Sequence, residues 1–428
     1  MATTTLYPKE SAIREGIKAV GIGKKGSRAL SRELAETIWE ELNASRVPPL
    51  ERGAFFAALF LKGITPEEKL LAGCFPSGVF DDAAALASDL AADAPAEIRN
   101  ICTLLLQGKE LDKIHAYRLG QFLLSQLPGD GARGLAASVL RVRYETADEY
   151  AGLLQAMQET IQPAFRQAVP PGDPIVQLAE PFDGVDQSML ITPLIASHLI
   201  KRGYRLVHLI GRSSGPKRVL NLLDLARGLQ CRPVQSALEI TDAQPRFGHF
   251  ANQEDLSKPI DRWVDLRRRI VKRPFMATLE RFLDPFGADI LIASAFHPPY
   301  TEKMITIAER LAVKAAMIVR NGIEGTLAFP LLRSAKIMCS ARQADGSYLR
   351  QEFDFDPQAA LSHGLTIEEK IEHPDVRENT RLVEQFSRNG TTDNEHFNVR
   401  IQATRRGFDL AFDWIESHAV FFNKRSKQ

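Results

Sequence analysis

Residues 209–218 read LIGRSSGPKR and place hydroxyl, glycine and cationic residues in one short turn ahead of an apolar stretch. Backbone N–H groups at a helix start favour anions, and hydroxyl and cationic side chains add further donors. The stretch therefore predicts an anion-binding loop, with a solvated turn as the alternative. Its candidate ligand-binding residues are Gly211, Arg212, Ser213, Ser214, Gly215, Lys217 and Arg218.

A second loop occupies a similar place, between an apolar run and an expected helix. Residues 180–193 read EPFDGVDQSMLITP. Pro181 has no N–H group to donate, and Asp183 and Asp186 add negative charge where an anion would have to bind. We expect this loop to bind a diphosphate weakly, with Gly184 and Thr192 as its candidate ligand-binding residues.

Two basic stretches suggest a different ligand. GIGKKGSRALSR begins at residue 21, and DRWVDLRRRIVKRPF begins at residue 261 and includes Trp263 and Phe275. Cations with interleaved aromatic rings suit a phosphate backbone and a stacked base. The alternative is a solvated basic helix face with Trp263 in the core, and Asp261, Asp265 and Glu280 dilute the charge. The candidate nucleic-acid residues are Lys24, Lys25, Arg28, Arg267, Arg268, Arg269 and Lys272.

The composition is that of a globular protein with a large core. Of 428 residues 44% are hydrophobic and 25% charged, and the formal net charge is +1, so any affinity for polyanions must come from local patches. The four cysteines are widely spaced, which predicts neither a zinc site nor a disulfide framework. We find no signal core and no apolar run long enough to span a membrane, and we expect a cytoplasmic protein without membrane contact.

The order of the expected elements predicts an α/β protein with two domains. Residues 1–165 have helical periodicity throughout, with a stretch at 77–100 expected to be one acidic linking helix. From residue 172 to 428, short apolar runs such as PIVQLA, YRLVHLI, ADILIASAF and AAMIVR alternate with helical stretches. That alternation favours a mostly parallel sheet. A hairpin is expected around Asp345-Gly346, and a long amphipathic helix closes the chain.

The helical domain contains an internal duplication. A shift of 81 residues aligns LERGAFFAALFLKGITPEEKLLA with GARGLAASVLRVRYETADEYAGL without a gap. Matched pairs include Leu30/Leu111, Lys62/Arg143, Thr65/Thr146 and Glu68/Glu149. The alternative is chance similarity between amphipathic helices. We expect tandem units at about 25–75 and 106–160.

These motifs resemble the anthranilate phosphoribosyltransferases, a family related to tryptophan biosynthesis. The resemblance rests on AALFLKGITPEEKLLAG, on ITPLIASHLIKRGYRLVHLIGRSSGPKRVLNLLDLARGL, on KRPFMATLERFLDPFG and on RNGIEG, and it covers most of residues 25–335. It implies a helical domain and an α/β domain of the nucleoside phosphorylase type in a homodimer formed through the helical domain. It also implies that Arg273 corresponds to a substrate-contacting arginine.

The family's catalytic motifs are largely missing. Its Gly-Thr-Gly-Gly-Asp loop corresponds to EPFDGVD here, and its magnesium-binding Asp-Glu pair corresponds to Leu327-Ala328, with the nearby Glu324 expected at the surface. Some degenerate members of the superfamily bind nucleic acid, and DGVDQSMLITPL and GPKRVL resemble theirs. We therefore expect a protein that binds nucleic acid or another phosphorylated ligand, with no cofactor or metal. The alternative is an active glycosyl- or phosphoribosyltransferase with an unknown acceptor, which would need Mg²⁺.

Overall fold

The computed structural model describes residues 11–23, 26–215, 217, 219–296, 298–361, 368 and 370–419. Its contacts divide the chain into a helical unit, residues 1–157 with 262–277, and an α/β unit, residues 158–261 with 278–428. The predicted boundary between the two domains, at residues 165–172, remains a prediction. No sequence pattern indicated that residues 262–277 group with the helices that precede them.

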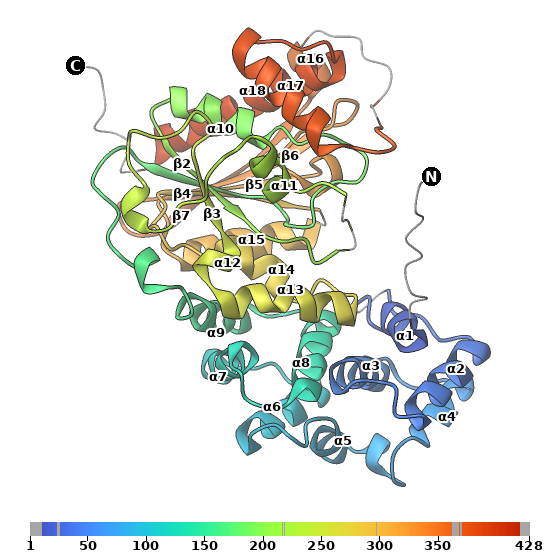
Figure 1. Cartoon of the computed structure of the whole chain (residues 1–428). Helices are drawn as coiled ribbons and strands as arrows, with labels where there is room; N and C mark the ends of the chain where they lie inside the picture. The colour runs from blue at the N-terminus through green and yellow to red at the C-terminus, as the bar shows by residue number, and fades with distance from the viewer. Residues whose placement is uncertain are drawn as a thin grey trace. The chain divides into compact units, whose positions relative to one another are not determined.

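The helical unit contains no strand among its described residues (Figure 1). Its helices are α1 (Ala12–Val20), α2 (Arg32–Asn43), α3 (Pro49–Lys62), α4 (Lys69–Ala72), α5 (Ala83–Leu90), α6 (Ala96–Leu106), α7 (Lys113–Leu124), α8 (Asp130–Arg143) and α9 (Ala147–Gln158), with short 3-10 turns at Pro66–Glu68 and Val79–Asp81. The expected single linking helix at 77–100 is wrong: α5 ends at Leu90 and α6 starts after Pro95. Proline within a helix removes a hydrogen bond and clashes with the preceding turn, so the chain breaks there.

The two predicted copies of the helical unit contain equivalent hydrogen bonds. Glu68 accepts hydrogen bonds from Leu30 N at 2.9 Å and Thr65 N at 2.9 Å. Glu149 accepts them from Leu111 N at 3.0 Å and Thr146 N at 2.8 Å. The cation that ends the preceding helix, Lys62 in one copy and Arg143 in the other, contacts the same carboxylate.

Close packing of α3 against α8 joins the two copies through small residues. A Cβ built at Gly53 would lie 2.1 Å from the carbonyl oxygen of Gly131, and one built at Gly134 would lie 1.9 Å from that of Leu50. Gly53 and Gly134 are equivalent under the 81-residue shift. The backbones of α3 and α8 therefore approach each other closely at these two glycines, where a side chain would not fit.

The α/β unit is built on a seven-stranded sheet in the order β3-β2-β1-β4-β5-β6-β7 (Figure 1). The first five strands in that order are parallel, and β6 and β7 are antiparallel additions. The strands are β1 (Ile175–Ala179), β2 (Arg205–Ile210), β3 (His249–Asn252), β4 (Ile290–Ala295), β5 (Ala315–Arg320), β6 (Ala335–Arg342) and β7 (Tyr348–Phe355). The predicted α/β class with a mostly parallel sheet is confirmed.

Helices cover both faces of this sheet. Figure 1 shows α10 (Thr192–Lys201) and α18 (Glu395–His418) on one side and α15 (Pro298–Arg310) on the other. The remaining helices of the chain are α11 (Leu222–Gly228), α12 (Gln253–Leu256), α13 (Lys258–Ile270), α14 (Met276–Leu279), α16 (Pro357–Leu361) and α17 (Val376–Asn389). The strands β1, β2 and β4 are buried at every position, as expected for parallel strands covered on both faces.

Local sequence patterns predicted most of these helices, strands and turns. The hairpin turn is confirmed, because Gly346 has a φ of 85° and Ser347 N donates to Asp345 Oδ1 at 2.9 Å. The closing amphipathic helix is α18. The four-residue strand β3 was not predicted, because so short a run carries no readable periodicity. Within the described residues no helix is long and apolar enough to cross a membrane.

Candidate functional site

The two candidate loops follow neighbouring parallel strands and therefore lie at the same edge of the sheet. The first loop runs from β1 to α10 and the second from β2 to α11. Val185 N donates to the carbonyl oxygen of Leu220 at 2.8 Å, which joins them. Gly184 has a φ of 80°, and a Cβ built on it would lie 2.0 Å from the same oxygen. Glycine is required there by both conformation and space.

The donors of the first loop converge on a carboxylate from a distant part of the chain, Glu324. Glu324 Oε2 accepts a hydrogen bond from Asp186 N at 2.8 Å, and Oε1 accepts one from Gln187 N at 2.9 Å. Ser188 Oγ donates to Oε1 at 2.8 Å. Consecutive backbone N–H groups with a hydroxyl form the arrangement that binds anions in loops. The anion bound by this loop is therefore the protein's own carboxylate, Glu324.

The second loop contributes a cation to the same carboxylate. Lys217 Nζ donates to Glu324 Oε2 at 2.8 Å and to the Glu324 carbonyl oxygen at 3.0 Å. Burial acts to raise the pKa of the Glu324 carboxyl, but the hydrogen bonds from Lys217 and the first loop outweigh it and lower that pKa below its usual range. The side chain of Glu324 is 17% exposed, so the expectation of a surface residue is wrong.

The other groups of the second loop are engaged within the protein. Arg212 makes an ion pair with Asp261, with Nη2 to Oδ2 at 2.7 Å. Ser213 Oγ donates to the Lys217 carbonyl oxygen at 2.5 Å and accepts from Gly215 N at 3.1 Å. Ser214 is buried, with its Oγ 3.5 Å from Asp183 Oδ1. The cations and hydroxyls that the sequence predicted as ligand-binding groups therefore make contacts within the protein that stabilise the loop.

The remaining predicted loop residues frame this arrangement. A Cβ at Gly211 would lie 2.6 Å from the Phe182 ring, so a larger residue does not fit. Gly215 has a φ of 86°. Thr192 is buried at the start of α10. Arg218 lies outside the described residues, and Arg273 belongs to the helical unit rather than to the unit that carries both loops.

The residues at the implied magnesium position do not fit a metal. Leu327 and Ala328 are buried and apolar, and Leu327 N donates to the buried carboxylate of Glu180 at 2.9 Å. Mg²⁺ requires hard oxygen ligands. Glu324, the nearest acid in sequence, already accepts hydrogen bonds from both loops. In the described part of the chain no three His, Cys, Asp or Glu side chains gather as a metal group.

The two aromatic residues of the basic stretch around α13 lie in the core of the helical unit. Trp263 is 0% exposed and its Nε1 donates to the Leu123 carbonyl oxygen at 3.0 Å, while Phe275 packs against it. The proposed stacking of a base on these rings is therefore wrong, because both are core residues. Arg269 forms an ion pair with Glu51 at 2.8 Å.

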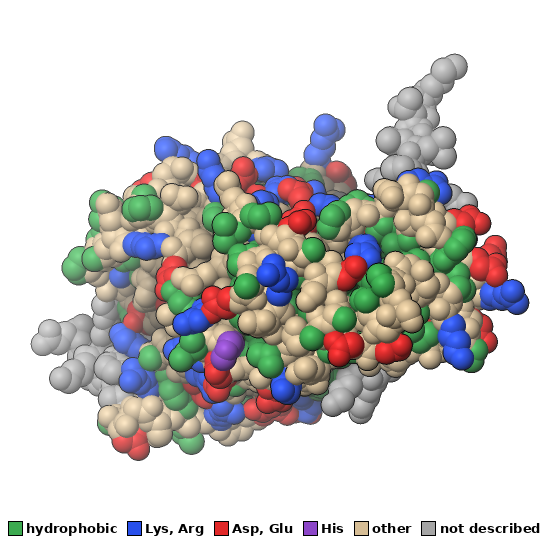
Figure 2. Space-filling view, turned by 90° about the horizontal axis from the view of Figure 1, so that it is seen from below, with side chains coloured by type: hydrophobic (Ala, Val, Ile, Leu, Met, Phe, Trp, Pro, Cys, Tyr) green, Lys and Arg blue, Asp and Glu red, His purple; other side chains and the backbone are tan. Residues whose placement is uncertain are grey.

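The other candidate cations of this stretch differ in exposure. Arg267 is buried, Arg268 pairs with Asp265 at 3.2 Å, and Lys272 Nζ donates to Ser138 Oγ at 3.0 Å. Arg28 is exposed, and Lys24 and Lys25 lie outside the described residues. On the face that Figure 2 shows, basic and acidic side chains are interspersed and neither forms a continuous band.

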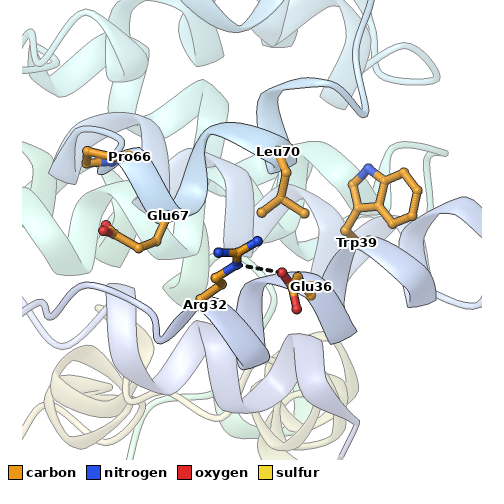
Figure 3. A pocket seen from close by; sticks show the side chains of 6 residues that line it. All are labelled: Arg32, Glu36, Trp39, Pro66, Glu67 and Leu70. Carbon is orange, nitrogen blue, oxygen red and sulfur yellow. Dashed lines mark hydrogen bonds and ion pairs between the residues drawn. The ribbon is translucent and has the colours of Figure 1, made fainter.

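A hollow of about 540 Å³ lies on the first helical copy, lined by Arg32, Glu36, Trp39, Pro66, Glu67 and Leu70 (Figure 3). Trp39 is 41% exposed, and Arg32 pairs with Glu36 at 2.8 Å. In the second copy Gly120 stands at the position of Trp39, and a Cβ built there would lie 2.7 Å from Ala156 of α9. The first copy has the four-residue α4 where the second copy has the longer α9.

No protein-family model matches the chain. It is similar to an uncharacterized protein of Aquifex aeolicus (strain VF5), 22% identical over 217 residues, which is 51% of this chain and 64% of that protein. It is also similar to the uncharacterized protein YbiB of Escherichia coli (strain K12), 26% identical over 227 residues, or 51% of this chain and 67% of that one. The match therefore spans less than two thirds of the Aquifex protein.

Among solved structures the chain resembles anthranilate phosphoribosyltransferases. The enzyme from Thermus thermophilus has a TM-score of 0.55 and 17% identity, covering 74% of this chain and 90% of that one. The Saccharomyces cerevisiae enzyme in complex with PRPP and Mg has a TM-score of 0.56 and 15% identity, covering 76% and 94%. The chain thus has the fold of the anthranilate phosphoribosyltransferases.

Proposed function

We propose that this chain is a phosphoribosyltransferase-like protein that binds nucleic acid or another phosphorylated ligand and does not transfer a phosphoribosyl group. The observation that carries the proposal is the position of Glu324. Its carboxylate takes the N–H groups of Asp186 and Gln187 and the ammonium of Lys217. These are the donors that a diphosphate would need in loops placed at the ends of β1 and β2.

Electrostatics adds to this argument. A diphosphate in the first loop would have to displace Glu324, and the loop itself contains two further acidic residues, Asp183 and Asp186. Two like charges about 4 Å apart repel each other by ~4 kcal/mol at an effective dielectric constant of ~20, so added acidic residues oppose the binding of an anion. We therefore expect a phosphorylated partner to bind at hydrogen-bond donors outside these two loops.

Nucleic acid is the partner class we favour, because the helical unit carries exposed cations. Arg28, Arg46 and Lys109 are exposed there. A net charge of +1 restricts binding to such local groups, since the bulk charge attracts no polyanion. Binding through phosphate contacts should weaken steeply with salt because counterions are released.

The test combines a measurement of oligonucleotide binding with a variant, Glu324→Ala, that frees the hydrogen-bond donors of the two loops. Fluorescence anisotropy with a labelled single-stranded oligonucleotide across a salt series should show binding that weakens with salt. Phosphoribosyl diphosphate with Mg²⁺ should neither compete nor raise the Tm of the wild-type protein. In Glu324→Ala the same compound should raise the Tm, because the donors of both loops are released.

The alternative is an active glycosyl- or phosphoribosyltransferase in which Glu324 moves aside. One observation favours it: donors from both loops still converge on one anion. Magnesium-dependent consumption of phosphoribosyl diphosphate by the wild-type protein, lost in Lys217→Met, would establish this alternative and overturn the proposal.

A further inference from the structure

The strand β7 is the last strand of the sheet, and among the described residues it pairs on one side only, with β6. It is eight residues long and contains neither proline nor glycine, the residues that most often interrupt strand pairing. Five of its residues, Leu349, Arg350, Gln351, Glu352 and Asp354, are exposed. An exposed edge strand of this length offers a row of backbone groups to another strand.

One hydrogen bond of β6 identifies the backbone groups of β7 that point away from the sheet. Arg342 N donates to the carbonyl oxygen of Lys314 at 2.9 Å, so the backbone of Arg342 points toward β5 and away from β7. Tyr348, which lies opposite Arg342, is therefore in a non-hydrogen-bonded pair, and its own N–H and C=O point outward. This orientation recurs at every second residue. The outward-pointing residues of β7 are Tyr348, Arg350, Glu352 and Asp354.

The carbonyl oxygen of Glu352 agrees with this assignment. It accepts a hydrogen bond from the side-chain amide of Gln351, with Nε2 at 2.8 Å. A neighbouring strand would supply a backbone N–H to such an oxygen, and here an exposed side chain supplies the donor instead. The amide of Gln351 can turn away when a strand approaches, because nothing buries it.

The sequence of β7 complements itself when two copies run antiparallel with Gln351 opposite Gln351. Arg350 then lies opposite Glu352 of the second copy in a hydrogen-bonded pair, which brings opposite charges together on one face. Leu349 lies opposite Phe353 of the second copy on the other face. A shift of two residues in either direction would set Arg350 against Arg350 or Glu352 against Glu352. Charge therefore selects the register centred on Gln351.

The charges of this edge do not oppose a second copy, because each also has a partner within its own chain. Edge strands commonly carry charges that prevent association. Here Arg350 pairs with Glu309 of α15 at 2.5 Å. Lys336 of β6 lies 2.9 Å from Asp354 and 3.5 Å from Glu352. The edge therefore presents charges of both signs that are already compensated.

On the opposite face of β7 the same pairing would cover an exposed apolar side chain. Leu349 is 42% exposed. Phe353 packs edge-on against Trp414 of α18, with 6.3 Å between the ring centroids. Contact of Leu349 with Phe353 of the second copy would extend this apolar cluster across the two-fold axis, and such cross-strand pairs stabilise a sheet.

We propose that β7 is an interface between two copies of this chain, which joins their sheets edge to edge through one antiparallel pair of strands. Such an interface uses the same surface of both copies, related by a two-fold axis that passes at Gln351. The candidate loops and the basic stretch of α13 take no part in it. The interface therefore goes beyond the proposed function and would form whether or not the protein binds nucleic acid.

The variant Gln351→Cys tests the register directly. The two cysteines would face each other in a non-hydrogen-bonded pair with Cα atoms about 4.5 Å apart, which is within the range of disulfides. Mild oxidation should therefore give a covalent dimer on a non-reducing gel. Ala344→Cys is the matched control, because Ala344 is exposed in the loop of the same hairpin, outside the paired stretch, and should not link. The wild type, with four native cysteines, gives the background.

An exchange of charges tests the interface without cysteine. Arg350→Glu would set acidic residues against each other, and Glu352→Arg would set basic residues against each other, so each variant alone should sediment at a lower mass than the wild type. A mixture of the two variants should restore the wild-type mass, because their charges are again complementary. Thermal unfolding of each variant checks that it is folded.

Three outcomes would overturn the proposed interface. Equal linking of Gln351→Cys and Ala344→Cys would show chance collision rather than a fixed register. A wild type with the mass of one chain, together with no linking of Gln351→Cys, would show that β7 does not associate. A dimer whose mass neither charge variant changes, and which Gln351→Cys does not link, would show association through another surface.

Discussion

Glu68 and Glu149 occupy equivalent positions in the two helical copies, and each carboxylate accepts backbone hydrogen bonds from a residue 38 positions earlier and from a residue three positions earlier. Both side chains are buried. Each therefore fixes the start of one helical unit to the turn at its end. A pair of buried carboxylates with the same partners is the strongest structural sign of the duplication.

Replacing either carboxylate should destabilise the protein. Glu68→Gln removes a charged acceptor from Lys62 and replaces one acceptor oxygen by a donor that faces a backbone N–H, which should cost about 1–3 kcal/mol of unfolding free energy. Glu149→Gln should cost a similar amount. Urea unfolding of each variant measures this, with the exposed Glu67→Gln as control. No loss in either buried variant would contradict the assigned role.

The acid stability of the helical unit should depend on Glu68. Burial acts to raise the pKa of Glu68, but hydrogen bonds from Lys62, Leu30 and Thr65 outweigh it and lower that pKa. A lowered carboxyl pKa gives stability that is present above the unfolded value, about 4.3, and is lost as the pH falls through the folded value. The Tm of the wild type should therefore fall more than that of Glu68→Gln between about pH 5 and pH 3. Parallel curves for the two proteins would contradict this expectation.

Contact between α3 and α8 should tolerate no side chain at its two glycines. Gly53→Ala and Gly134→Ala would each place a methyl group within 2.1 Å of a backbone oxygen. Helix backbones must then separate, at a cost of about 1–3 kcal/mol. Gly73→Ala is the matched control, because Gly73 has helical angles and its added Cβ would lie 3.1 Å from the nearest atom. Thermal unfolding of the three variants ranks them, and equal Tm values would disprove the close approach.

The pair formed by Lys217 and Glu324 should be energetically coupled. A double-mutant cycle with Lys217→Met, Glu324→Gln and the double variant should give a coupling of about 1–3 kcal/mol, because both side chains are mostly buried and hydrogen-bonded. Additive effects in the cycle would show that the two residues do not interact in solution. The proposal of a loop closed by its own carboxylate would then lose its basis.

Lys272 should make stability rise with pH above neutrality. Its folded pKa of about 7 lies below the unfolded value of about 10.4, so between them the unfolded chain binds a proton that the native protein has released. Stability therefore increases from about pH 7 to about pH 10 through this group. Comparing Tm values across that range for wild type and Lys272→Met tests the point, since the variant should lack this increase.

Local patterns in the sequence determined the class of fold and the repeated helical unit. Helix spacing, the cap at Thr65 and Pro66, the glycine at 63 and buried apolar runs such as IVQLA all act over a few residues. Such signals can be read along the chain because helix and strand geometry repeats every two to four residues. The ungapped match under a shift of 81 residues predicted the duplication, and Glu68 and Glu149 make equivalent hydrogen bonds in the two copies.

Only the tertiary structure decided which partners the residues of the candidate loops and basic stretches contact. Glu324 meets Asp186 across 138 positions and Lys217 across 107, and no local pattern marks such a contact. Burial of Trp263 and the ion pair of Arg269 with Glu51, across 218 positions, likewise depend on packing between distant segments. A sequence shows which groups can bind an anion, but the folded chain decides whether its own carboxylates already do so.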